Sequence, residues 1–444
     1  MPDDLKLFPD AAVPPPTTAP QPEEAGAPRV LTPNRAQVEL RPVDLESLLP
    51  HDHRARAVWD FVVGTDLHEL YDAIKAREGT VGRGATDPRL LLALWLYATV
   101  EGVGSARALA RLCREHHAYQ WLCGGVPTNH HTLGDFRVAH SAVLERLLTT
   151  SVATLMAAGV VTLTRVAQDG MRVRASAGAA SFRRKATLER CLAEAEAQVA
   201  ALRAEVNADP GATSRREQAA RERAARERRE RVAAALTQLP EVEAKKKAAD
   251  KAKARASTTD PEARVMKMAD GGFRPAYNAQ LATDTGSQVI VGVAVTNQGC
   301  DQGLMPPMVE QLEDRYGTVP AEHLVDGGFV VKEDIAQVSE GGTTVYAPVP
   351  APKDPQRDPH CPLPEDAAVI AAWRVRMGTD AAKTIYKDRA ATAECVNALA
   401  RERGLQRVRV RGRTKVLAVL LWYALAHNLL RIVALGAVSA AALT

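Results

Sequence analysis

The sequence has few aromatic residues, which make up 4% of its 444 positions. Its core must therefore be built mainly from leucine, valine and alanine, and alanine-rich helices are expected. Cysteine is also scarce, and its six positions are far apart without any CxxC pair, which excludes a disulfide framework or a zinc ribbon. No phosphate-binding GxxxxGK[ST] loop occurs, so we expect no use of ATP or another nucleotide.

Long hydrophobic runs are absent as well. The longest, residues 416–430, is shorter than the roughly 20 residues that span a bilayer, and it contains His427 and Asn428. The N-terminus is acidic and has no apolar signal core. We therefore expect a cytoplasmic protein without a membrane partner.

The excess of positive charge is small and is concentrated in one part of the chain. The formal net charge is +4, while residues 183–267 hold 21 Lys/Arg against 14 Asp/Glu, an excess of +7. The remainder therefore carries a net charge of −3. One strongly basic segment indicates a polyanionic partner.

The first 158 residues contain two kinds of sequence. Residues 1–40 are rich in proline and cannot form a packed core, so they are predicted to be a disordered tail. Residues 41–158 contain signals for the starts of helices. Asp87, which precedes Pro88, and Ser105 are predicted N-caps, and a long helix is predicted from Thr132. Short helices joined by glycine-containing turns favour a helix-turn-helix-like DNA-binding domain, with a small helical bundle as the alternative.

From Val160 the pattern changes to strands, within a predicted domain of residues 159–444. Residues 160–170 predict a strand that ends on Asp169, and residues 276–283 and 288–296 predict a hairpin. A short apolar strand is expected to end at Asp326. Further elements are expected at residues 302–316, 343–348, 384–401 and 415–435. This mixed order of strands and helices is typical of an α/β fold.

A long polar insertion, residues 183–258, follows the first strand. Its apolar positions step by four and three residues, as in the a/d seam of a coiled coil: Leu188, Leu192, Ala195, Val199, Leu202 and Val206. Residues 207–212 break the pattern, and residues 214–239 predict a second helix rich in Arg and Glu. We expect an antiparallel helical hairpin, whose charges form either intrahelical Glu–Arg pairs or a DNA contact.

Three acidic residues could carry chemistry. Asp169 and Asp326 are expected at strand ends, each followed by glycine, and Glu394 lies on a later helix. Carboxylates without His or Cys favour Mg²⁺ or Mn²⁺, and two such ions can activate water at a phosphodiester. The alternative is that each acid is a turn residue or an exposed charge. Asp270 also begins an Asp-Gly-Gly-Phe segment, but it follows no apolar strand and is assigned to a turn.

Histidine pairs give no support for a zinc site. They occur at His51/His53, His116/His117 and His130/His131, without a partner cysteine or an HExxH pattern. Roles in capping, in the core or at DNA phosphates are expected instead.

Several long sequence blocks resemble one known family. They read AQDGMRVRASA, ARVMKMADGGFRPAYNAQLATD, LVDGGF and YKDRAATAECVNALARERGLQRVRVRGRTKVLAVLLWYALAHNLLR, and DPRLLLALWLYATVEGVGSARALARLCREHHAYQWLCGG and NHHTLGDFR precede them. Together they resemble bacterial insertion-sequence transposases of the DDE class, from about Leu40 to Arg431. The resemblance implies a ribonuclease H-like mixed sheet, with the hairpin inserted after its first strand, and an all-α N-terminal domain.

The resemblance also implies roles for the acids. Asp169 resembles the first catalytic aspartate, Asp326 the second, after the fourth strand, and Glu394 the glutamate of a signature that begins with Tyr386 and Arg389. The three would bind Mg²⁺ or Mn²⁺. The spacing departs slightly from the family pattern, and Arg401 replaces its downstream lysine, so Glu402 is an alternative third acid.

A run of basic residues near the third acid would neutralise DNA phosphates if it lines a groove, and would otherwise form a solvated charged face. The predicted DNA-binding residues are Arg389, Arg401, Arg403, Arg407, Arg409, Arg411, Arg413 and Lys415. The resemblance implies a metal-dependent DNA transposase acting on terminal inverted repeats and target DNA, as a homodimer. The alternatives are a catalytically inactive or repurposed DNA-binding protein, and a nuclease that cuts without strand transfer.

Overall fold

The computed structural model describes residues 44–77, 84–208 and 214–436, together with Ala36, Val38, Pro42, Gly79 and Val81. The predicted tail, residues 1–40, lies outside the described residues except for Ala36 and Val38. All elements named below belong to one unit, which begins at Asp44.

The chain begins with helices. They are α1 (Arg54–Gly64), α2 (His68–Asp72), α3 (Pro88–Val100), α4 (Ala106–Glu115), α5 (His117–Cys123), α6 (His130–Ala139) and α7 (Ser141–Ala157). Asp87 caps α3 and Ser105 caps α4 through their side chains, as predicted. The prediction of one helix from Thr132 is wrong, because the backbone leaves the helical region at His140 (φ −121°, ψ 41°) and α7 begins there.

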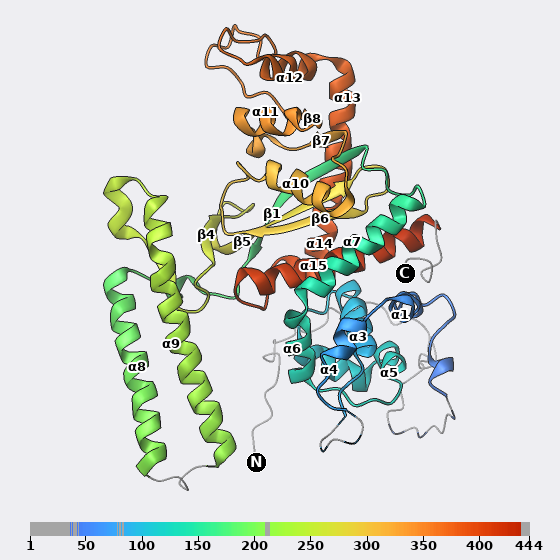
Figure 1. Cartoon of the computed structure of the whole chain (residues 1–444), viewed down its shortest axis with the longest axis vertical. Coiled ribbons are helices and arrows are strands. Elements are labelled where there is room, and N and C mark those ends of the chain that lie inside the picture. Colours follow the sequence, from blue (N-terminus) through green and yellow to red (C-terminus); the bar gives the residue numbers. More distant parts are fainter. Residues whose placement is uncertain are drawn as a thin grey trace, which may run out of the picture. The chain divides into compact units, whose positions relative to one another are not determined.

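A six-stranded mixed sheet follows, which confirms the α/β class (Figure 1). Its strands are β1 (Arg165–Arg174), β4 (Arg264–Lys267), β5 (Phe273–Asp284), β6 (Ile290–Thr296), β7 (Glu322–Leu324) and β8 (Thr344–Tyr346). The order is β4-β5-β1-β7-β8, and β6 also pairs with β5. β1 is antiparallel to β5 and parallel to β7, and β7 is parallel to β8.

The prediction that the first strand ends at Asp169 is wrong. β1 starts at Arg165 and continues to Arg174, so Asp169 lies in its middle. The strand continues because Met171 and Val173 maintain the buried alternation and β5 pairs with it as far as Arg174. The second predicted end is also shifted, since β7 stops at Leu324. Strand β4 was not predicted, so Asp326 follows the fifth strand of the main sheet in chain order rather than the fourth.

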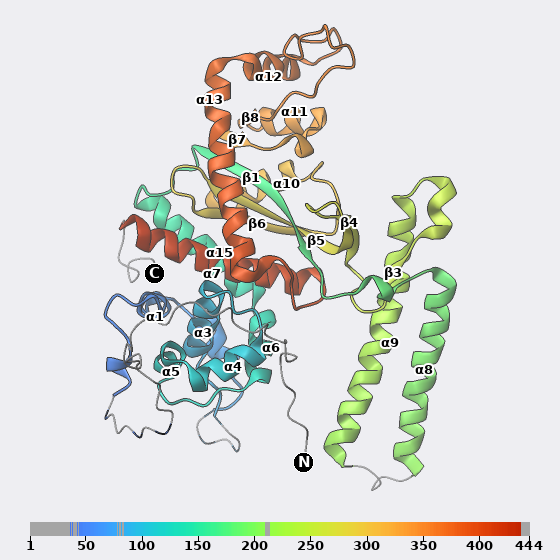
Figure 2. The same cartoon turned by 180° about the vertical axis from the view of Figure 1, so that it is seen from behind.

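Helices in the second half of the chain lie around this sheet (Figure 2). They are α10 (Met305–Tyr316), α11 (Lys332–Glu340), α12 (Ala368–Gly378), α13 (Asp380–Arg389), α14 (Cys395–Ala400) and α15 (Arg413–Leu435). A π-helical segment, Ala390–Glu394, joins α13 to α14, and this segment contacts β1 and β5. The predicted helix 384–401 therefore exists but begins earlier, at Asp380, while α11 and α12 were not predicted.

Helix α15 connects the N-terminal helices to the sheet. It packs against α3, α6 and α7 and against β6. The Asn428 side chain donates to the carbonyl of Ile290 and accepts from its N–H, both at 2.8 Å, so it supplies backbone partners to strand β6. By length and composition α15 could cross a membrane, but 78% of its most apolar window is buried within the protein. The boundary expected between an N-terminal domain, residues 41–158, and a second domain, residues 159–444, stays a prediction.

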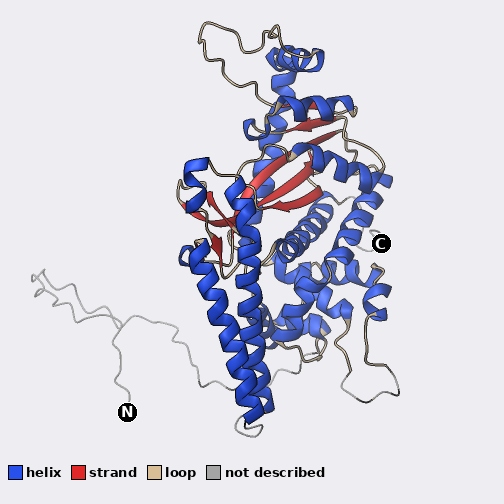
Figure 3. Ribbon diagram, turned by 60° about the vertical axis from the view of Figure 1, so that its left-hand side comes forward, coloured by secondary structure: helices blue, strands red, loops and turns tan. Residues whose placement is uncertain are grey.

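The insertion after β1 is a helical hairpin, as its a/d seam predicted (Figure 3). Helices α8 (Lys185–Ala208) and α9 (Arg215–Ala244) pack against each other, and β2 (Phe182–Arg183) pairs with β3 (Ala256–Ser257) where the insertion leaves and rejoins the chain. The charges form ion pairs between the helices as well as within them: Arg221 lies 3.1 Å from Glu205, and Arg228 lies 3.7 Å from Glu194.

Candidate active site

Asp169 is held in a defined orientation in the middle of the sheet. Its Oδ1 accepts a 2.8 Å hydrogen bond from the Gly170 N–H, and its Oδ2 accepts a 2.9 Å bond from the Asn397 side chain on α14. The side chain is 18% exposed. Burial raises the pKa of Asp169, the Arg389 guanidinium opposes this, and the charges of Asp326 and Asp301 raise it further.

Asp326 lies just after the neighbouring strand. β1 and β7 pair in parallel up to Ala167 and Leu324, and Asp326 follows two residues after β7 ends. Its Oδ1 accepts a 2.8 Å bond from the Gly328 N–H and so caps the turn Gly327–Phe329. The two predicted aspartates, far apart in sequence, therefore come close enough for the charge of Asp326 to raise the pKa of Asp169.

Glu394 is linked to Asp169 by the side chain of Arg389. The Arg389 guanidinium lies 3.2 Å from Glu394 and 3.7 Å from Asp169, so one cation contacts both carboxylates. Glu394 itself is 60% exposed at its side chain. Glu402, the alternative third acid, lines a separate pocket with Gly102 and Arg403.

The side chains of the candidate site have the kind of ligand atoms that a hard divalent cation prefers. Asp169, Asp326 and Glu394 offer only oxygen ligands, and the buried Oδ1 of Asn397, beside Asp169, has no hydrogen-bond partner. Within the residues that the structure describes, no group of three or more His, Cys, Asp or Glu side chains is arranged to hold an ion. The Arg389 guanidinium instead contacts two of the three carboxylates.

Sequence reasoning missed Asp301, a carboxylate buried next to this site. Its oxygens accept hydrogen bonds from Asn278 (2.7 Å) and Gln280 (2.9 Å), and it pairs with Arg172 at 2.9 Å. It also lies close to Gly170, because a Cβ at that glycine would be 2.2 Å from Asp301 Oδ1. Asn278 and Gln280, two polar residues at alternate positions of an apolar strand, were the sequence signal for a buried partner.

A basic pocket of about 630 Å³ opens beside Gly170. Its cationic lining consists of Arg172, Arg174, Lys267, Arg274 and Arg401. Asp270 also lines it, in the turn between β4 and β5, where it accepts from the Gly272 N–H and pairs with Arg274 at 2.7 Å. The assignment of Asp270 to a turn is confirmed.

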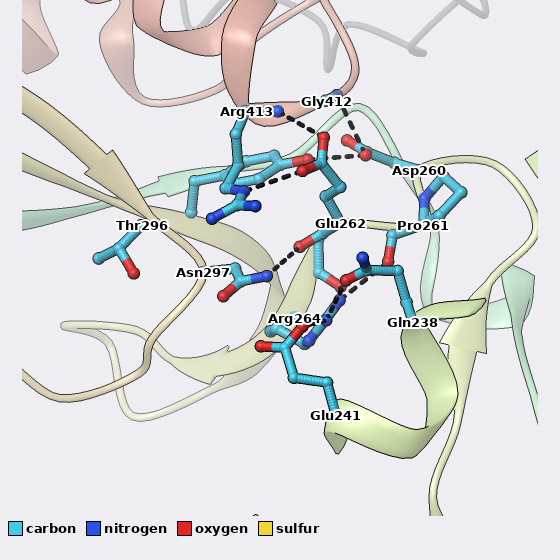
Figure 4. Close-up of polar contacts among 12 residues, drawn as sticks. Gln238, Glu241, Asp260, Pro261, Glu262, Arg264, Thr296, Asn297, Gly412 and Arg413 are labelled. Atoms are coloured by element: carbon cyan, nitrogen blue, oxygen red, sulfur yellow. Dashed lines mark hydrogen bonds and ion pairs between the residues drawn. The ribbon is translucent and has the colours of Figure 1, made fainter. Parts of the chain in front are cut away.

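The predicted DNA-binding residues have different environments. Arg401, Arg407, Arg409, Arg411 and Lys415 are exposed, and Arg403 is half-buried. Arg389 is held within the acidic site. Arg413 is paired with Glu262 at 2.8 Å, and the Glu262 carboxylate also accepts from its backbone N–H (Figure 4).

Figure 4 shows that this pair belongs to a larger polar network at the start of α15. The buried Asp260 accepts from the Gly412 N–H, and Arg264 reaches Gln238 and Glu241 on α9. The network therefore ties the base of the hairpin to α15, which gives Arg413 a structural partner apart from DNA.

The fold and site thus define an α/β protein with Asp169 on a central strand of its sheet, other carboxylates nearby, and a basic pocket beside them. Residues 43–139 match the family described as a transposase domain (DUF772), and residues 364–433 match the transposase DDE domain. In these two segments the chain is similar to insertion-sequence transposases of the DDE class. No curated protein and no solved structure matches it.

These matches cover particular parts of the site. The second segment includes Arg389, Glu394 and the basic run that follows, while neither segment includes Asp169 or Asp326. Transposases of the DDE family act on DNA and typically use divalent metal ions.

Proposed function

We propose that this protein is a transposase that cleaves DNA at the ends of an insertion sequence and transfers the freed strands to target DNA. The proposal rests on the contacts of Arg389 with both Asp169 and Glu394 and on the effect of the Asp326 charge on Asp169. These three acids come from distant parts of the sequence. The sheet supports a ribonuclease H-like core, since β6, β5 and β1 are antiparallel neighbours while β1, β7 and β8 are parallel.

Asp169, Asp326 and Glu394 would hold Mg²⁺ or Mn²⁺. The bound metal would activate water and stabilise the leaving oxygen of a phosphodiester. The Gly170 N–H and Asn397 fix the direction of the Asp169 carboxylate. Arg389 keeps Asp169 and Glu394 close together and limits their mutual repulsion.

Cleavage and joining are two similar displacements. In the first, a water oxygen forms a bond to phosphorus, the bond from phosphorus to the 3′-oxygen breaks, and a 3′-hydroxyl is released. In the second, the oxygen of that hydroxyl forms a bond to a phosphorus of target DNA and gives up its proton. The bond from this phosphorus to the target's 3′-oxygen breaks, that oxygen takes up a proton and leaves as a 3′-hydroxyl, and no covalent enzyme intermediate forms.

The remaining parts would bind and position DNA in the bacterial cytoplasm. Residues 41–158 would recognise the terminal inverted repeats, and a homodimer would hold two ends together. The exposed arginines from Arg401 to Arg411 and Lys415 would contact DNA phosphates. Such contacts contribute most of the salt-dependent affinity of DNA-binding proteins.

The test measures nicking and binding together. The DNA flanking the gene supplies the inverted repeat, which is end-labelled and incubated with the protein in Mg²⁺ or in EDTA. Asp326→Asn keeps the size of the side chain but removes one charge of the metal site, so nicking should fall to background. DNA binding should persist, because its affinity comes from the basic side chains.

Asp314→Asn, the same change at an exposed position on α10, is the matched control and should nick normally. Wild-type protein that binds the repeat but never nicks it with any divalent ion would favour a binding protein without catalysis. An Asp326→Asn variant as active as wild type would remove Asp326 from the site.

A further inference from the structure

A second pocket, of about 590 Å³, lies where the end of α3 meets the segment that follows α14. Two glycines allow the backbones to approach: a Cβ on Gly404, whose φ is +87°, would lie 3.2 Å from the carbonyl oxygen of Gly102. A larger residue at either position would separate the two segments or fill the space. The pocket therefore depends on contact between the N-terminal helices and the C-terminal part of the chain.

The lining of this pocket is strongly basic. It contains five arginines and a single acid, Glu402; the arginines are Arg137, Arg401, Arg403, Arg407 and Arg409. Such an excess of one charge in a concave site raises the local concentration of anions.

Arg137 is the most constrained of these arginines. It comes from α6, stacks over the Trp95 ring at 4.7 Å and donates to the Gly104 carbonyl oxygen at 2.7 Å. Burial and the charge of Arg409 lower the pKa of Arg137 to about 10, which leaves it charged at neutral pH. Its Nε is buried without a hydrogen-bond partner.

Arg403 has a similar unused donor, because its Nη1 is also buried without a partner. Leaving buried donors of cationic groups unsatisfied is costly, and an anion with several oxygens would satisfy both. A phosphate group has the charge and the number of acceptors that this arrangement requires.

This pocket is connected to the candidate active site. Arg401 and Gln406 line both it and the basic pocket beside Gly170. The backbone of the same segment pairs with the end of β1, since Arg174 N–H donates to Gln406 and Val408 N–H donates to Arg174. A basic path therefore leads from the strand that carries Asp169 to Arg137.

We infer that this pocket binds a phosphate group of the DNA backbone, clamped between Arg137 from α6 and the arginines of residues 401–409. The inference rests on the proposed transposase function and extends it. Arg137 and residues 401–409 belong to the two separately matched segments, so one phosphate would connect both of them. A free phosphate has the same chemistry, and the experiment separates the two sources.

The experiment uses the full chain in EDTA, so that binding is read without cleavage. Affinity for a labelled DNA duplex is measured by fluorescence anisotropy over a range of salt concentrations. Arg403→Gln and Arg409→Gln should each weaken binding several-fold for any DNA sequence and reduce the salt slope by about one. Arg137→Gln should weaken binding and reduce the salt slope in the same way. If loss of the Arg137–Trp95 stacking impairs folding of that variant, the exposed Arg409 provides the test instead.

Arg357→Gln, the same change in an exposed loop away from both pockets, should leave affinity and slope unchanged. Arg403→Gln and Arg409→Gln variants that both keep the wild-type affinity and salt slope would overturn the inference. A site for free phosphate alone would also overturn it. In that case inorganic phosphate would raise the melting temperature of the wild type but not of the variants, while the variants would bind DNA as the wild type does. Failure of the wild type to nick DNA would count against the transposase activity alone.

Discussion

Gly170 is the position where one added methyl group should disturb the candidate site most. A Cβ there would lie 2.2 Å from Asp301 Oδ1, about 1 Å short of the 3.4 Å at which ordinary contact begins. Gln280 Nε2 and Asn278 Oδ1 would also be too close, at 2.6 and 2.9 Å. The backbone of Gly170 is not in the left-handed region, so Gly170→Ala tests the steric effect alone.

The cost follows from the contacts of Asp301. If its carboxylate retreats by about 1 Å, the bonds from Asn278 and Gln280, now 2.7 and 2.9 Å, exceed hydrogen-bond distance. Hydrogen bonds to a charged group contribute about 1.5–3 kcal/mol each, and overpacking a tight site costs about 1–3 kcal/mol. We expect Gly170→Ala to lower the free energy of unfolding by roughly 3 kcal/mol.

Urea unfolding followed by tryptophan fluorescence measures this loss. Gly178→Ala is the matched control, because no atom lies within 4 Å of its Cβ, and its effect should stay within about 0.5 kcal/mol. In the double variant with Asp301→Ala the shortest of these contacts disappears while those with Gln280 and Asn278 remain, so adding Gly170→Ala should cost less than it does in the wild type. Equal urea midpoints for Gly170→Ala and Gly178→Ala would refute the reasoning.

Two further predictions concern the insertion and pH. Replacing the hairpin by a two-residue turn from Arg183 to Ala256, paired residues of β2 and β3, should leave the protein folded but weaken DNA binding or assembly; loss of all soluble protein would show that the hairpin belongs to the core. Burial lowers the pKa of His323 and His427 from 6.5 to about 4. Between pH 6.5 and pH 4 the unfolded state therefore binds more protons than the folded state, and the urea midpoint should fall as the pH decreases through this range. His323→Gln should make that fall shallower, and an unchanged profile would contradict the assignment.

Local sequence signals were sufficient for many individual elements. Asp87 and Ser105 satisfy the first N–H groups of α3 and α4 whatever surrounds them, so these helix starts could be predicted. The a/d seam from Leu188 fixed the pairing of α8 with α9 because both helices meet through neighbouring residues of the chain. The order of strands and helices likewise indicated the α/β class.

Strand ends depended on partners that are distant in sequence. Asp169 looked like the end of a strand because a glycine follows it, but β5 continues to pair with β1 as far as Arg174. The charge of Asp326 reaches Asp169 only because β7 pairs in parallel with β1, a pairing that no local pattern contains.

The sequence by itself determined the residue types of the candidate site: three acids without His or Cys, and a basic run beside the third. Only the tertiary structure decided which side chains meet. It placed Arg389 between Asp169 and Glu394, put Asp301 against Gly170, and paired Arg413 with Glu262 rather than leaving it unopposed. The physical reason is that charge and hydrogen bonding act over a few ångströms, whereas all these partners except Arg389 and Glu394 are separated by more than 100 residues along the chain.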